Sequence, residues 1–350
     1  MDDQPALAAL WTDPAPVGTL AQVTSRAASS TAVLVCQGRA VADGRLAVGR
    51  FSDPVARELL DPSERALVDD VREGLHPTTG GARMAWELVR QTALGMVPRT
   101  VAIDRAVAEA VAEALARAPA EVAGEAAGDA VAEAVAARAS GAVADGSGTG
   151  QVVILGAGLD ARAWRMAELA RSTVWEVDHP ASQEDMRRRV GGRPPVAAHL
   201  EWVAVDLADQ PLAPALEAAG FDRRQPSTWV WEGVVPYLTC QQVDRTLRQV
   251  GELAAPGSTL VVNYQARSWV TAVLRRGMRL VARLLRQQDP LRAEPWRSHW
   301  SPAQMGRALG RHGFHVVADD DLLTLSAGMD LTGANALSMR NGRVAVATRS

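Results

Sequence analysis

Lysine is absent from this chain of 350 residues, so all 37 basic residues are arginine. Together with the alanine-rich composition, this absence indicates a GC-rich bacterial coding bias, and we attach no function to it. Cysteine is scarce as well: Cys36 and Cys240 lie in different regions of the chain. Two separated cysteines make neither a disulfide framework nor a metal-binding cluster. We therefore expect no metal site.

A strong net charge and long apolar runs are also missing. The formal net charge is −3, which removes the electrostatic case for binding nucleic acid or an anionic membrane. No signal-peptide pattern precedes the chain and no apolar run is long enough to span a bilayer, so we expect a soluble cytoplasmic protein. A hydrophobic content of 47% is enough for a full core. The length fits one large α/β domain with additions, or two domains.

The chain is organised around residues 151–180. An apolar run at 152–155 has the character of a strand, a glycine-containing turn follows at 156–161, and residues 163–169 are predicted to be helical. A second strand, 173–177, ends at Asp178. Glycines in such a turn let a ligand approach backbone N–H groups at the start of a helix. Asp178 lies where a carboxylate can accept both hydroxyls of a ribose, so this unit predicts a nucleoside cofactor.

The turn alone leaves the cofactor open. Gly156-x-Gly158-x-x-Ala161 also fits the nicotinamide dinucleotide fingerprint. An NAD-dependent oxidoreductase is therefore the competing hypothesis.

The sequence before residue 151 predicts helices only. Residues 1–22 form an arm with little periodicity, and 23–104 form a helical cap section in which Asp53 is the expected N-cap of a helix starting at Pro54. Another helix is expected to begin at Pro98. The further helices are predicted at 23–45, 63–73 and 84–96. The pattern does not decide whether this section is a lid over a ligand or a packing appendage.

Residues 105–150 form an alanine-rich insertion. The segments near 106–118 and 130–139 are near-copies with strong helix propensity, separated by Gly124 and Gly128. We expect a surface helical hairpin or partial disorder. Since such surfaces can mediate assembly, a non-catalytic cofactor-binding module is a third hypothesis. The oligomeric state is open, with a homodimer as one alternative.

The core, 151–350, continues as alternating helices and strands. Further strands are predicted at 202–207, 228–231, 259–263, 314–317 and 343–347, and further helices at 181–190, 241 onward, 268–288 and 302–312. Asp206 ends a strand, so it should face the same crevice as Asp178, where it could accept an adenine amine or simply cap the following loop. The terminal helix-strand-strand pattern resembles the antiparallel hairpin of class I methyltransferases. We therefore expect a Rossmann-like, mostly parallel sheet with a helical lid at about 266–300.

Taken together, the motifs resemble the leucine carboxyl methyltransferase-like family of S-adenosylmethionine-dependent enzymes. The combination of GAGLDAR with EGVVPYL is quite specific to that family, whereas neither half would suffice. The matching pieces are TSRAASSTAVLVCQGRA, SDPVAREL, PRTVAID, VVILGAGLDARAWR, VWEVDHP, WVAVDL, WVWEGVVPYLT and EPWRS.

The resemblance implies a set of site residues. Arg99 would pair with the carboxylate of the cofactor's methionine part, and Glu232 would lie near its amino group and sulfonium. Tyr237 would point towards the methyl acceptor. The other implied cofactor-binding residues are Gly156, Ala157, Gly158, Asp160, Asp178, Asp206 and Leu207.

The implied reaction is methyl transfer to oxygen of a small-molecule or peptide-terminal acceptor. A carboxylate acceptor needs no general base, whereas a phenol or alcohol would gain from one. His299 is the first candidate for that base and His179 the second. Trp269, Trp296 and Trp300 would supply flat apolar walls for the acceptor. The chain departs from its relatives in its long alanine-rich insertion and at Met186-Arg187.

Overall fold

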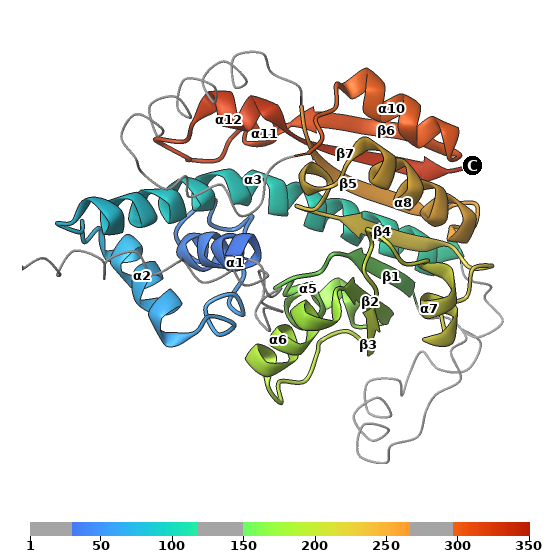
Figure 1. The fold of residues 1–350 in the computed structure, drawn as a ribbon, viewed down its shortest axis with the longest axis horizontal. Coiled ribbons are helices and arrows are strands. Elements are labelled where there is room, and N and C mark those ends of the chain that lie inside the picture. Colours follow the sequence, from blue (N-terminus) through green and yellow to red (C-terminus); the bar gives the residue numbers. More distant parts are fainter. Residues whose placement is uncertain (1–29, 118–149, 267–296) are drawn as a thin grey trace, which may run out of the picture.

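The computed structural model describes residues 30–117, 150–266 and 297–350 (Figure 1). A seven-stranded sheet in the order β3-β2-β1-β4-β5-β7-β6 forms its centre. The strands β1 to β5 pair in parallel, and β7 pairs antiparallel with both β5 and β6. The strands are β1 (Gly150–Leu155), β2 (Ser172–Asp178), β3 (His199–Ala204), β4 (Ser227–Trp231), β5 (Thr259–Gln265), β6 (Phe314–Asp321) and β7 (Gly342–Arg349).

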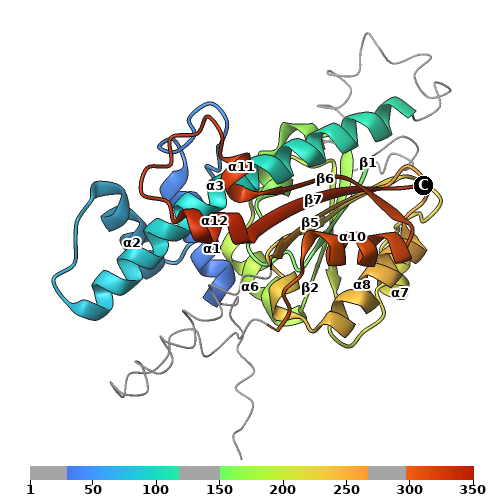
Figure 2. The same ribbon diagram turned by 90° about the horizontal axis from the view of Figure 1, so that it is seen from above.

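The predicted α/β class and the antiparallel C-terminal pair are both confirmed. Helices cover both faces of the sheet, and Figure 2 shows α7, α8 and α10 together on one of them. The helices are α1 (Ser30–Ala42), α2 (Pro62–Glu73), α3 (Gly80–Arg117), α5 (Arg162–Arg165), α6 (Pro180–Val190), α7 (Ala213–Ala218), α8 (Cys240–Leu253), α10 (Pro302–Arg311), α11 (Leu322–Leu325) and α12 (Ala336–Asn341), with 3₁₀ turns η2 (Ala167–Leu169) and η3 (Val235–Tyr237).

Residues 152–155 of β1 are all apolar because both faces of the strand are buried. Val152 and Ile154 pack into the cluster that contains α1, α2, α3 and α6. Val153 and Leu155 pack into the cluster beneath α7, α8 and α10. The uninterrupted apolar run in the sequence therefore reflects two cores, one on each side of the sheet.

Local signals set the helix starts. Thr239 is the N-cap of α8 and forms a capping box with Gln242. The same pattern begins α10, where Ser301 caps and Pro302 follows. His179 caps α6 through a hydrogen bond from Ala181 N–H to its Nδ1, at 3.2 Å. These starts place the strand-to-helix connections at one edge of the sheet.

Three predicted boundaries were wrong. Pro98 does not begin a helix but lies inside the 38-residue α3, because burial of its neighbours Val97 and Ile103 holds the helix on both sides of the missing N–H. Asp53 caps a turn rather than a helix: its Oδ1 accepts from Ala56 N–H at 3.0 Å. Strand β3 ends at Ala204, before the predicted residue 207, because as an edge strand it follows β2 only as far as Asp178.

Several predictions fall outside the described residues. These are the arm at 1–22, most of the alanine-rich insertion, and nearly all of the lid at 266–300, including Trp269 and Trp296. Among the helices that the structure does describe, none is long and apolar enough to cross a membrane. The predicted domain boundaries stay predictions, because the arm, most of the insertion and nearly all of the lid lie outside the described residues.

Candidate functional site

A cavity of about 490 Å³ opens at the carboxyl ends of the parallel strands. Helix α1 lies over it and contributes Thr31, Ala32, Val35 and Arg39 to its lining. Part of the helical cap section therefore lines the cavity, as a lid would. Of the residues implied by the family resemblance, the cavity brings together Arg99, Gly156, Ala157, Gly158, Asp160, Asp178, Asp206, Leu207, Glu232 and Tyr237.

The turn after β1 requires glycine at two positions. Gly156 and Gly158 have φ of +65° and +56°, which side chains other than glycine rarely adopt. A Cβ atom on Gly156 would also lie 2.4 Å from Cγ2 of Val234. On Gly158 it would lie 3.2 Å from Cβ of Ala32 in α1. The turn thus fits closely against both the β4 loop and the helix above it.

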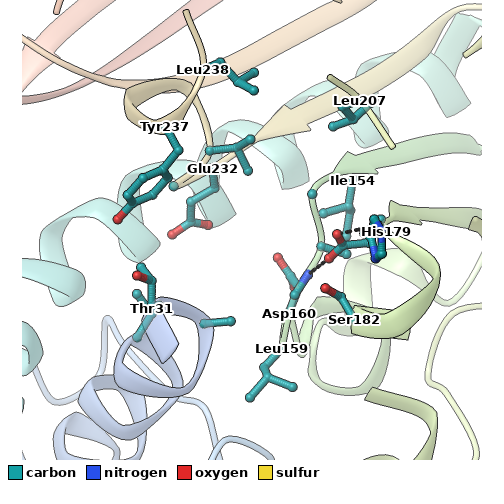
Figure 3. Close-up of a pocket in the computed structure, with 18 of the residues that line it drawn as sticks. Thr31, Ile154, Leu159, Asp160, His179, Ser182, Leu207, Glu232, Tyr237 and Leu238 are labelled. Carbon is teal, nitrogen blue, oxygen red and sulfur yellow. Dashed lines mark hydrogen bonds between the residues drawn. The ribbon is translucent and has the colours of Figure 1, made fainter. Parts of the chain in front are cut away.

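Asp178 holds this turn in place at the end of β2. Its Oδ2 accepts from Gly158 N–H at 2.6 Å, and its Oδ1 accepts from His179 N–H at 2.7 Å (Figure 3). Burial raises the pKa of Asp178 above its ordinary value, and these two backbone hydrogen bonds only partly oppose the shift. The carboxyl group lines the cavity and reaches a ligand from a fixed position.

Asp206 serves the loop that follows it. Its Oδ1 accepts from Ala208 N–H at 2.9 Å, so the cap-like role that the sequence left open is present. Asp206, Leu207 and Ala208 also line the cavity. The capping hydrogen bond therefore does not prevent this segment from contacting a ligand.

Glu232 follows β4 and lies between two guanidinium groups. Its Oε1 is 2.6 Å from Arg99 Nε, and its Oε2 accepts from Arg162 Nη2 at 2.7 Å. Burial alone would raise the pKa of Glu232, but Arg99 and Arg162 outweigh it and hold the pKa well below its ordinary value. Glu232 is therefore ionised.

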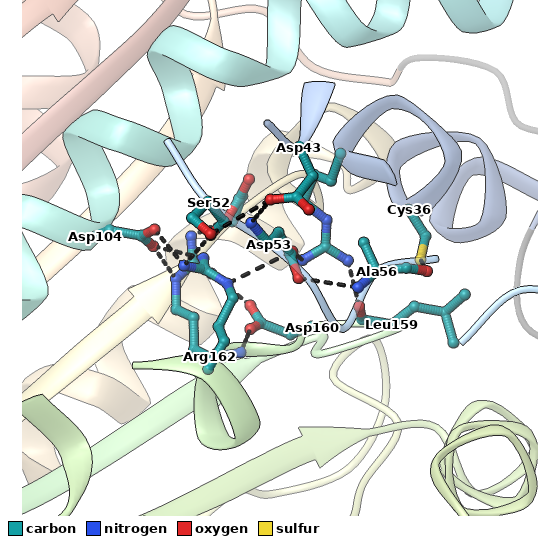
Figure 4. A network of polar contacts seen from close by, with 12 residues as sticks. Cys36, Asp43, Ser52, Asp53, Ala56, Asp104, Leu159, Asp160 and Arg162 are labelled. Carbon is teal, nitrogen blue, oxygen red and sulfur yellow. Dashed lines mark hydrogen bonds and ion pairs between the residues drawn. The ribbon is translucent and has the colours of Figure 1, made fainter. Parts of the chain in front are cut away.

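Arg162 belongs to a buried charge network that joins the cap section to the core (Figure 4). Arg162 donates from Nε to Asp104 Oδ1 at 2.8 Å and also pairs with Asp160. Arg165 pairs with Asp104 and Asp53, and Arg39 pairs with Asp53. The four arginines and four acids are Arg39, Arg99, Arg162, Arg165, Asp53, Asp104, Asp160 and Glu232. Their formal charges cancel, which is how so many ions can be buried together.

Some of the residues predicted for the acceptor side line the cavity, and others do not. Tyr237 in η3 lines the cavity, and so does His179, whereas His299 is not among the lining residues. The proposed role of Trp300 as a wall was wrong: its side chain is 7% exposed and packs in the core beneath α8 and α10. Arg297 lines the cavity, although the sequence did not single it out.

Sequence reasoning missed the network's hub and one buried acid. Arg162 is the last residue of the GAGLDAR motif. Its position in that motif was the signal that could have identified it. Glu176 in β2 is 1% exposed, and neither of its side-chain oxygens has a hydrogen-bond partner. Burial, with Asp160 and Asp178 nearby, raises its pKa well above the ordinary value. Across the described segments, no group of three or more His, Cys, Asp or Glu side chains could hold a metal ion.

Comparison with known proteins adds a family match. Residues 125–251 match the family model described as leucine carboxyl methyltransferase. A relative from Mycobacterium sp. (strain KMS) is 45% identical over 119 residues, which cover 33% of this chain and 38% of that protein. A second, from Mycobacterium tuberculosis (strain CDC 1551 / Oshkosh), is 46% identical over 125 residues, covering 35% and 39%. Both are provisionally named S-adenosyl-L-methionine-dependent methyltransferases.

The matched stretch spans well under half the length of these curated relatives. Among solved structures, a provisionally named methyltransferase from Thermobifida fusca is 15% identical, with 93% of this chain and 97% of that chain covered and a TM-score of 0.49. A DUF574 family protein from Streptomyces avermitilis is 14% identical, with 92% and 98% covered and a TM-score of 0.48. Residues 125–251 thus carry the sequence signature of the leucine carboxyl methyltransferase family, and the resemblance that the motifs indicated is confirmed.

Proposed function

We propose that this protein is an S-adenosylmethionine-dependent methyltransferase. The observation that carries the proposal is the distribution of charge along one cavity. Arg99 and Glu232 line it as a close pair, and Asp178 lines it where its carboxylate accepts from Gly158 N–H of the glycine turn. The family signature and the names of the relatives support the same reaction class.

The residues fit the cofactor's chemistry. The cofactor carries a carboxylate, an ammonium and a sulfonium, so it needs a guanidinium and separated acids. Arg99 Nε is buried and close to Glu232 but lacks hydrogen-bond geometry. Arg99 can therefore turn to a ligand carboxylate, while Glu232 keeps its hydrogen bond from Arg162 and faces the ammonium. When bound, the cofactor would supply an activated methyl group.

The turn fits a pyrophosphate poorly, which weighs against the NAD-dependent alternative. Nicotinamide dinucleotides need free backbone N–H groups at the start of a helix. Here Gly156 and Ala157 donate to Val177 O, and Gly158 donates to Asp178. The helix that follows, α5, is only four residues long.

For the acceptor we propose a carboxylate on a small molecule or a peptide terminus. An ionised carboxylate needs no proton removed, so the protein's task is alignment and exclusion of water. A phenol or hydroxyl acceptor is the second candidate, and His179 is the observation that favours it. This histidine lines the cavity, although its Nδ1 already accepts from Ala181 N–H.

Calorimetric titration with S-adenosylhomocysteine and with NAD tests the cofactor. We expect binding of the first alone, and binding of NAD alone would contradict the proposal. Mass spectrometry of candidate acids and phenols after incubation with the methyl donor then tests turnover. A product that mild base hydrolyses is the expected ester, whereas a base-stable ether would favour the hydroxyl alternative. Cofactor binding without methyl gain on any acceptor would favour a non-catalytic module.

A further inference from the structure

The strongest unassigned feature of the cavity is Arg297, at its rim beside Tyr237. Its backbone N–H donates to Pro236 O at 2.6 Å. The next residue, Ser298, is buried and donates from Oγ to Val235 O at 2.9 Å. Both bonds tie this segment to η3, the turn that carries Tyr237. The backbone of Arg297 is therefore held beside Tyr237, and its side chain starts from a fixed point.

Trp300 secures the other end of the segment. Its backbone N–H donates to Gln265 O at 3.0 Å, and its Nε1 donates to Ser298 Oγ at 3.2 Å. With Trp300 buried in the core, residues 297–300 are held to the ends of β4 and β5. Arg297 is thus the exposed end of a firmly held segment, and its side chain lines the cavity.

The other two arginines that line the cavity are already paired. Arg39 pairs with Asp53, and Arg99 pairs with Glu232. No ion pair joins Arg297 to another of the described residues. Since Arg99 is proposed to bind the carboxylate of the cofactor, Arg297 is the cation left for an anionic acceptor that enters the cavity.

Neither Asp178 nor Glu232 opposes such a molecule at this end of the cavity. In Figure 3, Tyr237 lies on one side of the cavity, with His179 and Leu207 on the other. Asp178 directly precedes His179, so its charge belongs to the side away from Tyr237. Glu232 lies close to Tyr237 in this view, but Arg99 and Arg162 balance its charge.

We propose that Arg297 recognises the acceptor by binding its carboxylate. This inference rests on the proposed methyl transfer and names the residue that selects the acceptor class. One carboxylate oxygen accepts from the guanidinium, which leaves the second free to attack. The attacking oxygen forms the O–CH₃ bond as the S–CH₃ bond breaks, and the electron pair of that bond stays on sulfur. The negative carboxylate and positive sulfonium become a neutral ester and a neutral thioether, and no proton is released.

Matched acids and amides test the proposal. The probes are benzoate with benzamide, indole-3-acetate with indole-3-acetamide, and Ala-Leu with Ala-Leu-amide, each assayed for transfer of a labelled methyl group. The variants are Arg297→Gln and Arg297→Lys. Arg307→Gln is the control, because Arg307 is also exposed but lies on α10 and does not line the cavity.

In the wild type we expect turnover of at least one acid and of none of the amides. Arg297→Gln should raise KM for that acid about 10- to 100-fold, the effect of losing one charge-assisted hydrogen bond, with S-adenosylhomocysteine affinity unchanged. The KM of Arg297→Lys should fall between those of the wild type and Arg297→Gln. The KM of Arg307→Gln should match that of the wild type. An unchanged KM in Arg297→Gln would overturn the proposal, as would a wild type that binds S-adenosylhomocysteine yet methylates none of the acids. Failure to bind S-adenosylhomocysteine would instead refute the proposed function itself.

Discussion

Asp178 shows how one side chain can serve both the fold and a ligand. It accepts backbone N–H groups from Gly158 and His179 and also lines the cavity. Its raised pKa means that the folded protein holds the proton more tightly than the unfolded chain does. This group therefore favours the folded state most at low pH, and its contribution declines as the pH rises from about 3.8 through the folded-state pKa.

Cofactor binding should depend on pH in the opposite sense, because ribose hydroxyls donate to the ionised carboxylate. We predict that the affinity for S-adenosylhomocysteine falls as the pH is lowered through the raised pKa of Asp178. Asp178→Asn should weaken binding at neutral pH by roughly 1–3 kcal/mol and remove this acid-side loss. Calorimetric titration of both proteins with S-adenosylhomocysteine across the acidic pH range measures this affinity. The same pH profile in wild type and variant would show that another group is responsible.

At the scale of the element, the β1–α5 turn is defined by its contacts on both sides. Gly156 meets the β4 loop at Val234, and Gly158 meets α1 at Ala32. A glycine pattern in a sequence shows that a turn is present. It does not show which neighbours the turn touches, since these come from segments far away in the chain.

Gly156→Ala should therefore destabilise the fold and also disturb the cavity. A left-handed conformation costs a residue with a side chain roughly 1–2 kcal/mol, and the contact with Val234 adds to this. Gly220→Ala is the matched control, because Gly220 has φ of +82° with nothing within 4 Å of the added atom. Urea unfolding should show a loss in both variants and a larger one in Gly156→Ala. Only Gly156→Ala should lose S-adenosylhomocysteine binding, and intact binding in that variant would contradict the assignment of this turn.

At the scale of the whole molecule, the charge network joins five separate segments. Arg39 comes from α1, Asp53 from the turn after it, Asp104 from α3, Arg162 from α5, and Glu232 from the end of β4. Arg162 is the hub and is 1% exposed. Removing a buried charge leaves its partners uncompensated, so the hub should matter far more than a surface ion pair.

Arg162→Met should lower the free energy of unfolding by about 3–5 kcal/mol. Arg57→Ala, which breaks an exposed pair with Asp69 at 2.7 Å, should cost about 0–1 kcal/mol. Urea unfolding of both variants makes the comparison, and equal losses would disprove the hub role. The pKa values of Asp104 and Glu232 lie below their ordinary values. Stability from the network is thus present above those ordinary values and is lost as the pH falls through the folded-state pKa values.

The sequence by itself determined most elements of the core and many of the residues that line its cavity. The apolar stretches of β1, β2 and β4 are buried on both faces, and local capping residues begin α8 and α10. The carboxyl ends of parallel strands meet at one edge, so Asp178, Asp206 and Glu232 were predicted to lie together before any contact was known. Pattern and motif sufficed here because each signal lies within a few residues of the element it describes.

Tertiary structure alone decided the rest. Pro98 stays within a helix because distant residues pack around it, and β3 takes its register from β2. Arg99 and Glu232 are 133 positions apart in the sequence, yet they face each other. Arg162 is a hub only because two acids from distant segments, Asp104 and Glu232, join the neighbouring Asp160 around it. Trp300 was predicted to be a wall of the acceptor site but lies in the core, and Arg297, which was not predicted, lines the cavity. Such placements depend on which segments meet in space, and no local pattern records that.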